Sequence, residues 1–288
     1  MVEVLALAQD TAGYLQQGEH AYKDKSLLKI NAFPDAYRDS ISLRYSMNNM
    51  LALEDTRWEI TPYLRYNQMA FLMHFLPGTP VEENDQQSFG VQINRHSNIN
   101  DRLSLKIASD IDLTKGSVLQ YQTAETESNS AFLRAVLPQG KHYDYSVFGQ
   151  NYALFSQLDM TLADNQNAFV AVRYDVTQYN YTNHMASGNL KEDGTACGFG
   201  GCRYTRPDDQ RTTFNDFSFS LGYSYAIDDN LIIFTKADDS FRAPHTAELY
   251  RLQNNQQNID INSVDANQLE IGMRYMNGDL FAEVNTAP

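Results

Sequence analysis

The sequence has no apolar run of the length that a transmembrane helix needs, which is about 20 residues. Its mean hydropathy of −0.48 is also too polar for a helical membrane protein. Basic residues are few, since 22 Lys and Arg stand against 36 Asp and Glu, and the net charge is −14. Nucleic-acid binding requires a basic stripe or patch, so this balance argues against a nucleic-acid partner.

Cysteine is nearly absent, and its two copies are Cys197 and Cys202, in the stretch A-C-G-F-G-G-C-R-Y. Two thiols at this spacing are too few and too far apart for a zinc site. The spacing favours a small disulfide that closes a glycine-rich loop, which would imply an oxidising compartment. The alternative is two free thiols in a loop.

Sequence patterns for catalysis and metal binding are also missing. His142, Asp144 and His184 have a spacing that we interpret as loop polarity rather than as a metal site. No G-x-S-x-G elbow accompanies the serines. We therefore predict no enzyme activity, no resident metal and no cofactor.

The start of the chain is not typical of a signal peptide, because acidic Glu3 lies before the apolar run and no basic residue does. An exported protein carries such a signal, so we expect the chain to be a piece of a longer protein.

What the sequence does contain is alternation with a period of two. Residues 217–227 read F-S-F-S-L-G-Y-S-Y-A-I, with large apolar side chains at odd positions and small ones between them. Successive side chains of a strand point to opposite faces, so this segment has one apolar face and one small, polar face. The same alternation recurs at 57–66, 103–113, 148–162, 170–176 and 269–275. No helical period competes with it, and the fold class is all-β.

The connections between strands alternate in length. Short links near 54–56, 98–101, 163–166, 228–229 and 277–278 contrast with long ones at 77–86, 114–144, 181–212 and 242–267. Long strands with short turns on one rim and long loops on the other are typical of an antiparallel, up-and-down transmembrane β-barrel, with short periplasmic turns and long extracellular loops. We predict about ten strands, at 40–53, 57–76, 87–97, 102–113, 145–162, 167–180, 213–227, 230–241, 268–276 and 279–286.

The two faces of such a wall have different partners, with the apolar face toward lipid and the polar face toward a wet lumen. Arg65, Arg173 and Arg274 fall on the polar face. They either meet an anionic substrate or a plug carboxylate, or pair with acidic residues of the wall such as Glu59, Asp175 and Glu270. Arg203 and Arg206, beside the cysteine loop, are candidate extracellular ligand contacts.

Tyrosines near the strand ends have two interpretations as well. The pairs Tyr143–Tyr145 and Tyr179–Tyr181 are typical of the aromatic girdles that lie at membrane interfaces. The alternative is the ordinary preference of tyrosine for strands.

The stretch S-F-R-A-P-H-T-A-E-L-Y at 240–250 follows a strand and opens a long Asn- and Gln-rich loop, which returns as a strand with E-I-G-M-R. This pattern resembles the barrel of TonB-dependent outer-membrane receptors, and the likeness extends from about Arg38 to the end of the chain. Its motif residues here are Phe241, Arg242, Ala243, Pro244, Glu248, Leu249 and Tyr250.

The resemblance implies residence in the outer membrane of a Gram-negative bacterium, in contact with lipid. It also implies import of a scarce nutrient, such as a ferric siderophore, with the help of a plug domain and TonB. The sequence departs from the family in having about ten strands rather than about 22, and in lacking a plug, a TonB box and a terminal aromatic residue. We therefore expect residues 1–39 to be a poorly defined leading segment or loop with room for one more strand. We expect residues 40–288 to be a partial barrel or open curved sheet, not competent for transport alone.

Two other readings remain open. In the first, the chain is a self-contained small outer-membrane barrel that acts as a porin, an adhesin or a structural protein. In the second, it is a soluble β-sandwich or propeller enzyme. One-sided loop lengths and the absence of a catalytic pattern disfavour the enzyme.

Overall fold

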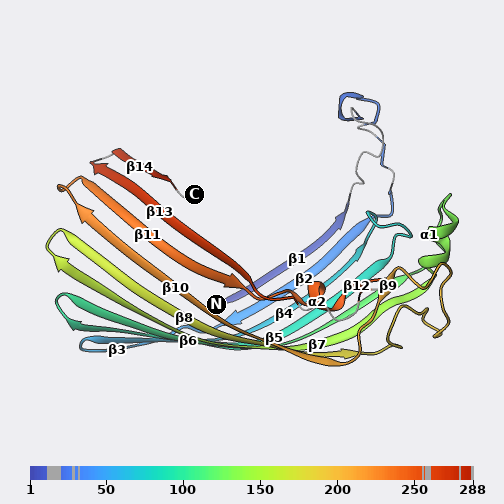
Figure 1. Cartoon of the computed structure of the whole chain (residues 1–288), viewed down its shortest axis with the longest axis horizontal. Helices are drawn as coiled ribbons and strands as arrows, with labels where there is room; N and C mark the ends of the chain where they lie inside the picture. The colour runs from blue at the N-terminus through green and yellow to red at the C-terminus, as the bar shows by residue number, and fades with distance from the viewer. Residues whose placement is uncertain are drawn as a thin grey trace.

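The protein forms one curved antiparallel sheet that is open at both edges in the computed structural model, which describes residues 1–11, 21–27, 30–31, 33–254, 256, 261–278 and 280–286 (Figure 1). The strands lie side by side in chain order, except that β2 and β3 both pair with β4, and β1 and β14 form the edges. The strands of this sheet are β1 Val2–Asp10, β2 Tyr37–Ser46, β3 Asn49–Leu53, β4 Thr56–Leu72, β5 Val81–Asn100, β6 Leu103–Gln122, β7 Gly140–Ala163, β8 Gln166–Asn183, β10 Gln210–Ala226, β11 Leu231–Arg242, β13 Val264–Asn277 and β14 Leu280–Thr286.

Small elements occupy the connections between these strands. They are η1 Ala21–Lys23, α1 Ala131–Val136, α2 Thr246–Tyr250, β9 Tyr204–Thr205 and β12 Leu252–Gln253, the last two paired with each other. None of the described helices is long and apolar enough to cross a membrane. The all-β class and the open curved sheet predicted from the sequence are both confirmed.

Several predicted boundaries are wrong. The segment predicted as one strand at 40–53 is two strands, β2 and β3, which pair with successive parts of β4. Residues 81–86 and 114–122 were predicted to lie in loops but extend β5 and β6. The sheet also starts before residue 40, because β1 pairs with β2 along its whole length. Polar side chains hid these strands, since a ladder of backbone hydrogen bonds does not require apolar side chains.

The two rims of the sheet differ as the sequence predicts. Tight turns join β5 to β6, β7 to β8, β10 to β11 and β13 to β14 at one rim. The links of 17 to 26 residues at 123–139, 184–209 and 243–263 all leave the opposite rim, where α1, α2 and β9 lie (Figure 1). This arrangement is that of a barrel wall with a short-turn rim and a long-loop rim.

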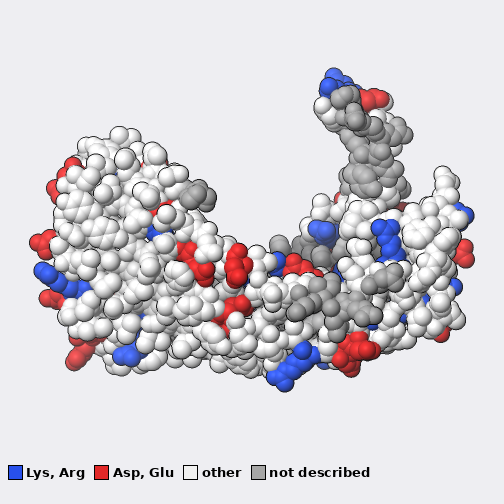
Figure 2. Space-filling view, in the orientation of Figure 1, with Lys and Arg blue, Asp and Glu red and all other residues white. Residues whose placement is uncertain are grey.

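The register separates the side chains into an apolar convex face and a polar concave face. Phe217 lies opposite Tyr174, and Leu221 lies opposite Val170, all on the convex face. Phe217 is 57% exposed. In the orientation of Figure 2, the lobe that holds β11, β13 and β14 is mostly uncharged, with charged side chains mainly along its outline and in the hollow. The eight steps from Phe217 to Tyr225, rising about 3.4 Å each and tilted by about 40°, span about 21 Å, close to the height of about 25 Å typical of a lipid-facing band.

Aromatic rings lie flat over glycines on the concave face. Phe169 covers Gly222, directly opposite it on the next strand, and Phe234 covers Gly272 in the same way. A Cβ atom at either glycine would overlap the ring. The glycines therefore let the rings lie along the wall instead of projecting from it.

We expect Gly222→Ala to destabilise the sheet by about 1–3 kcal/mol, because the new methyl group must displace the Phe169 ring. The measurement is urea unfolding in detergent micelles. Ser218→Ala is the control, since Ser218 shares the strand and the face but lies opposite Arg173 rather than under a ring. Equal stability of the two variants would contradict the packing described above.

Candidate functional site on the concave face

Five tyrosines join the long loops to the concave face near the long-loop rim. Tyr143, Tyr145 and Tyr181 project from β7 and β8, and Tyr204 and Tyr250 come from the loops. Tyr181 and Tyr250 stack with ring centroids 4.4 Å apart, and the Tyr143 hydroxyl donates a hydrogen bond to the Leu252 carbonyl at 2.9 Å. The girdle interpretation is therefore wrong for Tyr143, Tyr145 and Tyr181, which contact loops on the concave side and do not lie on the apolar convex face.

A β-bulge adapts β7 to these loops. The register between β6 and β7 shifts between Gln120 and Tyr121, so that His142 is an extra residue in its strand. His142 stacks on Tyr204 at 4.6 Å, and its Nε2 lies 2.8 Å from the Pro138 carbonyl. An extra residue of this kind redirects a side chain, and here it adds His142 to the side that holds the loops.

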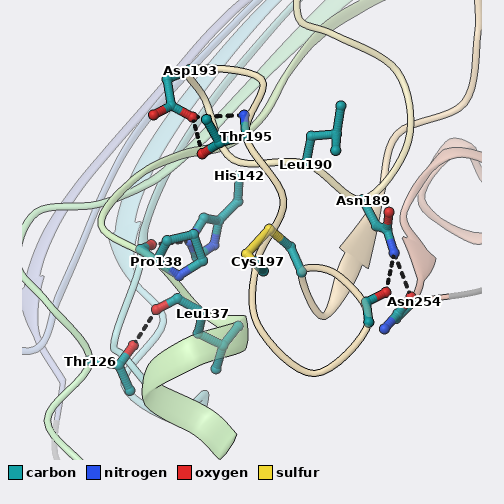
Figure 3. The surroundings of a disulfide bond; sticks show 12 residues. Thr126, Leu137, Pro138, His142, Asn189, Leu190, Asp193, Thr195, Cys197 and Asn254 are labelled. Carbon is teal, nitrogen blue, oxygen red and sulfur yellow. Dashed lines mark hydrogen bonds between the residues drawn. A yellow bond between two sulfur atoms is a disulfide. The ribbon is translucent and has the colours of Figure 1, made fainter.

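The structure joins Cys197 and Cys202 in a disulfide that lies beside α1 (Figure 3). Cys202 is fully buried, and its backbone N–H donates to the Asn189 carbonyl at 2.8 Å. The Asn189 side chain then donates to Asn254 at 2.7 Å (Figure 3). The disulfide hairpin thus connects the loop at 184–209 with the loop at 243–263.

Arg206 is buried and lies out of reach of a ligand. Its guanidinium group donates to three backbone carbonyls, those of Ala186 at 2.7 Å, His142 at 3.0 Å and Leu190 at 2.7 Å. The side chain is 1% exposed, so Arg206 holds the loop together instead of facing the solvent. Arg203 is exposed, and it lines a cavity of about 200 Å³ together with Arg251.

The F-R-A-P and E-L-Y residues form a latch between the end of β11 and α2. Arg242 donates to both carboxylate oxygens of Glu248, at 2.9 and 3.1 Å, and the His245 backbone N–H donates to the same carboxylate at 2.6 Å. These hydrogen bonds lower the pKa of Glu248 to about 2. Buried Pro244, Leu249 and Tyr250 then turn the loop back onto the concave face, so the motif has a structural role.

A buried ion pair ties the same loop to the wall. Arg251 meets Glu82 of β5 at 2.7 Å, and its Nε donates to the Tyr145 hydroxyl at 3.3 Å. Glu82 is 4% exposed. Burial lowers the pKa of Arg251, but the hydrogen bonds and charges of Glu82 and Tyr145 together outweigh that effect, and the net pKa is raised. Neither residue was predicted as a site residue, because Glu82 falls in a segment that was read as a loop.

The arginines of the wall have acidic partners. Arg65 pairs with Asp112, Arg274 with Glu283 at 2.8 Å, and Arg173 with both Asp175 and Asp110 at 2.7 and 3.0 Å. Pairing with acidic residues of the wall, one of the two interpretations of these arginines, is therefore present in the structure. Arg173 pairs with Asp175 as predicted, whereas Arg65 and Arg274 have partners that the sequence did not indicate. Glu59, the other acid considered near Arg65, pairs with Arg57 instead.

A polar cavity of about 510 Å³ lies on the concave face between this wall and α2. It is lined by Arg65, Asn84, Gln86, Asp112, Thr114, Asn151, Thr177, Tyr179, Ala243, His245 and Thr246, among others. Arg65, Asp112 and Thr177 each follow an apolar convex residue, so the period of two could have found them, whereas Asn84 and Gln86 have polar neighbours on both sides. What the sequence could not show is that α2 lies above them. The described residues contain no group of three or more His, Cys, Asp or Glu that is arranged to hold a metal ion.

The sequence matches the family model of the TonB-dependent receptor-like β-barrel over residues 7–286. The chain belongs to the TonB-dependent receptor family. The match begins inside β1, in agreement with the place of β1 in the sheet. No curated protein matches the sequence.

Solved receptors of this family share the fold. The ferric-catecholate import receptor Fiu of E. coli K12 superposes with a TM-score of 0.63 at 14% identity, over 88% of this chain and 41% of that one. The ferric yersiniabactin uptake receptor FyuA of Yersinia pestis gives 0.61 at 12% identity, over 88% and 36%. The siderophore receptor PiuA of Acinetobacter baumannii gives 0.61 at 11% identity, over 85% and 39%. The chain thus spans about two-fifths of the length of these TonB-dependent receptors.

Glu82→Gln leaves Arg251 without its buried counter-ion, and we expect this change to weaken the attachment of the loop at 243–263 by about 3 kcal/mol. Faster cleavage in this loop under limited proteolysis is the expected result. The control is Glu83→Gln, because Glu83 is the next residue but is exposed and projects from the other face. Equal cleavage of both variants would contradict the role of the ion pair.

The Glu248 latch should depend on pH. Because its folded pKa of about 2 lies below the ordinary 4.5, its stabilising effect is complete above pH 4.5 and is lost as the pH falls from 4.5 toward 2. Hydrogen exchange of the α2 amides should therefore accelerate over this window. In Glu248→Gln the exchange should already be fast at pH 5, with no further acceleration as the pH falls. An acceleration of unchanged size in that variant would show that another group causes the pH effect.

Proposed function

We propose that this chain is the barrel-wall part of an outer-membrane receptor that binds a scarce small-molecule nutrient and imports it with energy supplied through TonB. The observation that carries the proposal is the polar cavity on the concave face, between the wall and the inward-folded α2 loop. Its amide, hydroxyl and charged side chains offer hydrogen bonds to a polar ligand, and apolar surface lies beside them in the lining.

A ferric chelate is the ligand class that we favour. The solved receptors named above carry titles for ferric-catecholate import, ferric yersiniabactin uptake and a siderophore. A cavity of about 510 Å³ is within the range for small-molecule sites. The side chains on the concave face bind and orient such a ligand, and the cargo brings its own metal.

Transport requires parts beyond this wall. In the proposed receptor, a plug domain fills the concave side and TonB pulls on the plug. The wall supplies a polar, ion-paired surface beside it. The arginines Arg65 and Arg173, already neutralised by wall carboxylates, give the plug a surface of dipoles and shared charges along which it can move. The open sheet gives no support to a self-contained small porin or adhesin barrel, and the proposal includes no enzyme activity.

The test is uptake of radiolabelled iron by cells that express the natural-length receptor containing this chain, with catecholate, citrate and hydroxamate chelates as cargo. We expect Gln86→Leu, in the cavity, to weaken uptake of the transported chelate about five- to tenfold through the loss of one hydrogen-bonding group.

The matched control is Gln178→Leu, which makes the same change on the convex face and should leave uptake unaltered. Equal effects of the two substitutions would show that the ligand does not bind in this cavity. Failure of the receptor to import any chelate would remove the ferric-chelate assignment.

A further inference from the structure

Arg95 is the one charged side chain that the described strands place on the convex face in the half of the wall nearer the short-turn rim. It belongs to β5, where Phe89, Val91 and Ile93 precede it on the same face. Other convex charged residues, such as Lys115 and Arg211, lie nearer the long-loop rim. An isolated charge on a lipid-facing surface is costly and marks a functional position.

The neighbours of Arg95 are apolar or aromatic. Trp58 lies directly opposite on β4, and Ile107 lies directly opposite on β6. The guanidinium carbon is 5.6 Å from the centre of the Trp58 ring, and Trp58 is the only tryptophan in the sequence. Arginine over tryptophan is a favourable cation–π pair, and it holds the guanidinium group in one place on the convex surface.

The guanidinium group of Arg95 lacks an acidic partner within the described part of the chain. Its Nε is buried without a hydrogen-bond acceptor, and no carboxylate forms an ion pair with it there. Arg65, Arg173 and Arg274, on the concave face, are each paired with Asp or Glu. A planar, permanently charged group that is left unpaired next to lipid requires an anion from outside the protein.

The depth of Arg95 indicates which anion is available. Its partner Trp58 lies three residues from the Asp55 turn that ends the β3–β4 hairpin, so the pair lies at the short-turn end of the apolar band. Tryptophan is enriched where membrane meets water, and arginine extends its charged end toward that boundary. The anions at that boundary are the phosphates of the lipid headgroups.

We propose that Arg95 and Trp58 form a binding site for the phosphate of a phospholipid in the leaflet on the short-turn side. Arg95 donates two parallel hydrogen bonds to the phosphate oxygens, and the Trp58 ring packs on the glycerol and the upper acyl chain. The site rests on the membrane location in the proposed function. It adds a specific lipid contact that positions the wall in the bilayer.

The test is native mass spectrometry of the natural-length receptor in detergent micelles, with phosphatidylglycerol as the probe and dioleoylglycerol, which has no phosphate, as its counterpart. We expect the wild-type protein to retain phosphatidylglycerol and not dioleoylglycerol. Arg95→Gln should lower the retained phosphatidylglycerol about tenfold, because the charge-assisted hydrogen bonds are lost, and Arg95→Lys should keep most of it.

Arg57→Gln is the matched control, since Arg57 precedes Trp58 in β4 but projects from the concave face, and it should leave lipid retention unchanged. Equal loss in the Arg57 and Arg95 variants, or equal retention of both lipids by the wild type, would overturn the site. Iron uptake separates the two proposals: normal uptake without lipid retention defeats the lipid site alone, whereas a receptor that does not enter the membrane defeats the proposed function as well.

Discussion

The backbone hydrogen-bond ladder is the constraint on which the rest of this structure depends. A wall that faces lipid has no water to satisfy its N–H and C=O groups, so every strand within it must pair with neighbours on both sides. The up-and-down order meets this requirement for the inner strands of the sheet with the shortest connections, and strands of up to 24 residues carry the pairing well beyond the apolar band. Because the ladder fixes the register, it also decides which side chains share a face.

The two faces then have different tasks. On the convex face the side chains need only be apolar, and Phe217, Leu221 and Val170 meet that need without specific contacts. On the concave face the contacts are specific: rings cover glycines, arginines pair with acids, and three long loops join to the wall. The Arg251–Glu82 ion pair and the tyrosine cluster hold the α2 loop over the polar cavity, so the candidate ligand site depends on contacts far apart in sequence.

Alternation was enough to predict the fold class, the two faces and the two rims, since each follows from a period of two and from link lengths. It was not enough for the strand ends beyond the apolar band, where Glu82 and Gln86 read as loop residues. Arg206 is a candidate ligand contact from the sequence, which does not show that three carbonyls surround its guanidinium group. The F-R-A-P and E-L-Y residues identified the family, but their role as a latch appeared only in the structure.

The central claim is that the convex face meets lipid and the concave face is wet, and single cysteines introduced along 217–224 test it most directly. Cys197 and Cys202 are joined in a disulfide and leave the background free of reactive thiols. In vesicles that hold the natural-length receptor, a charged maleimide should label Ser218→Cys and Ser220→Cys, whereas Phe219→Cys and Leu221→Cys should react only with a maleimide dissolved in the lipid. Equal labelling of all four positions by the charged reagent would contradict the account.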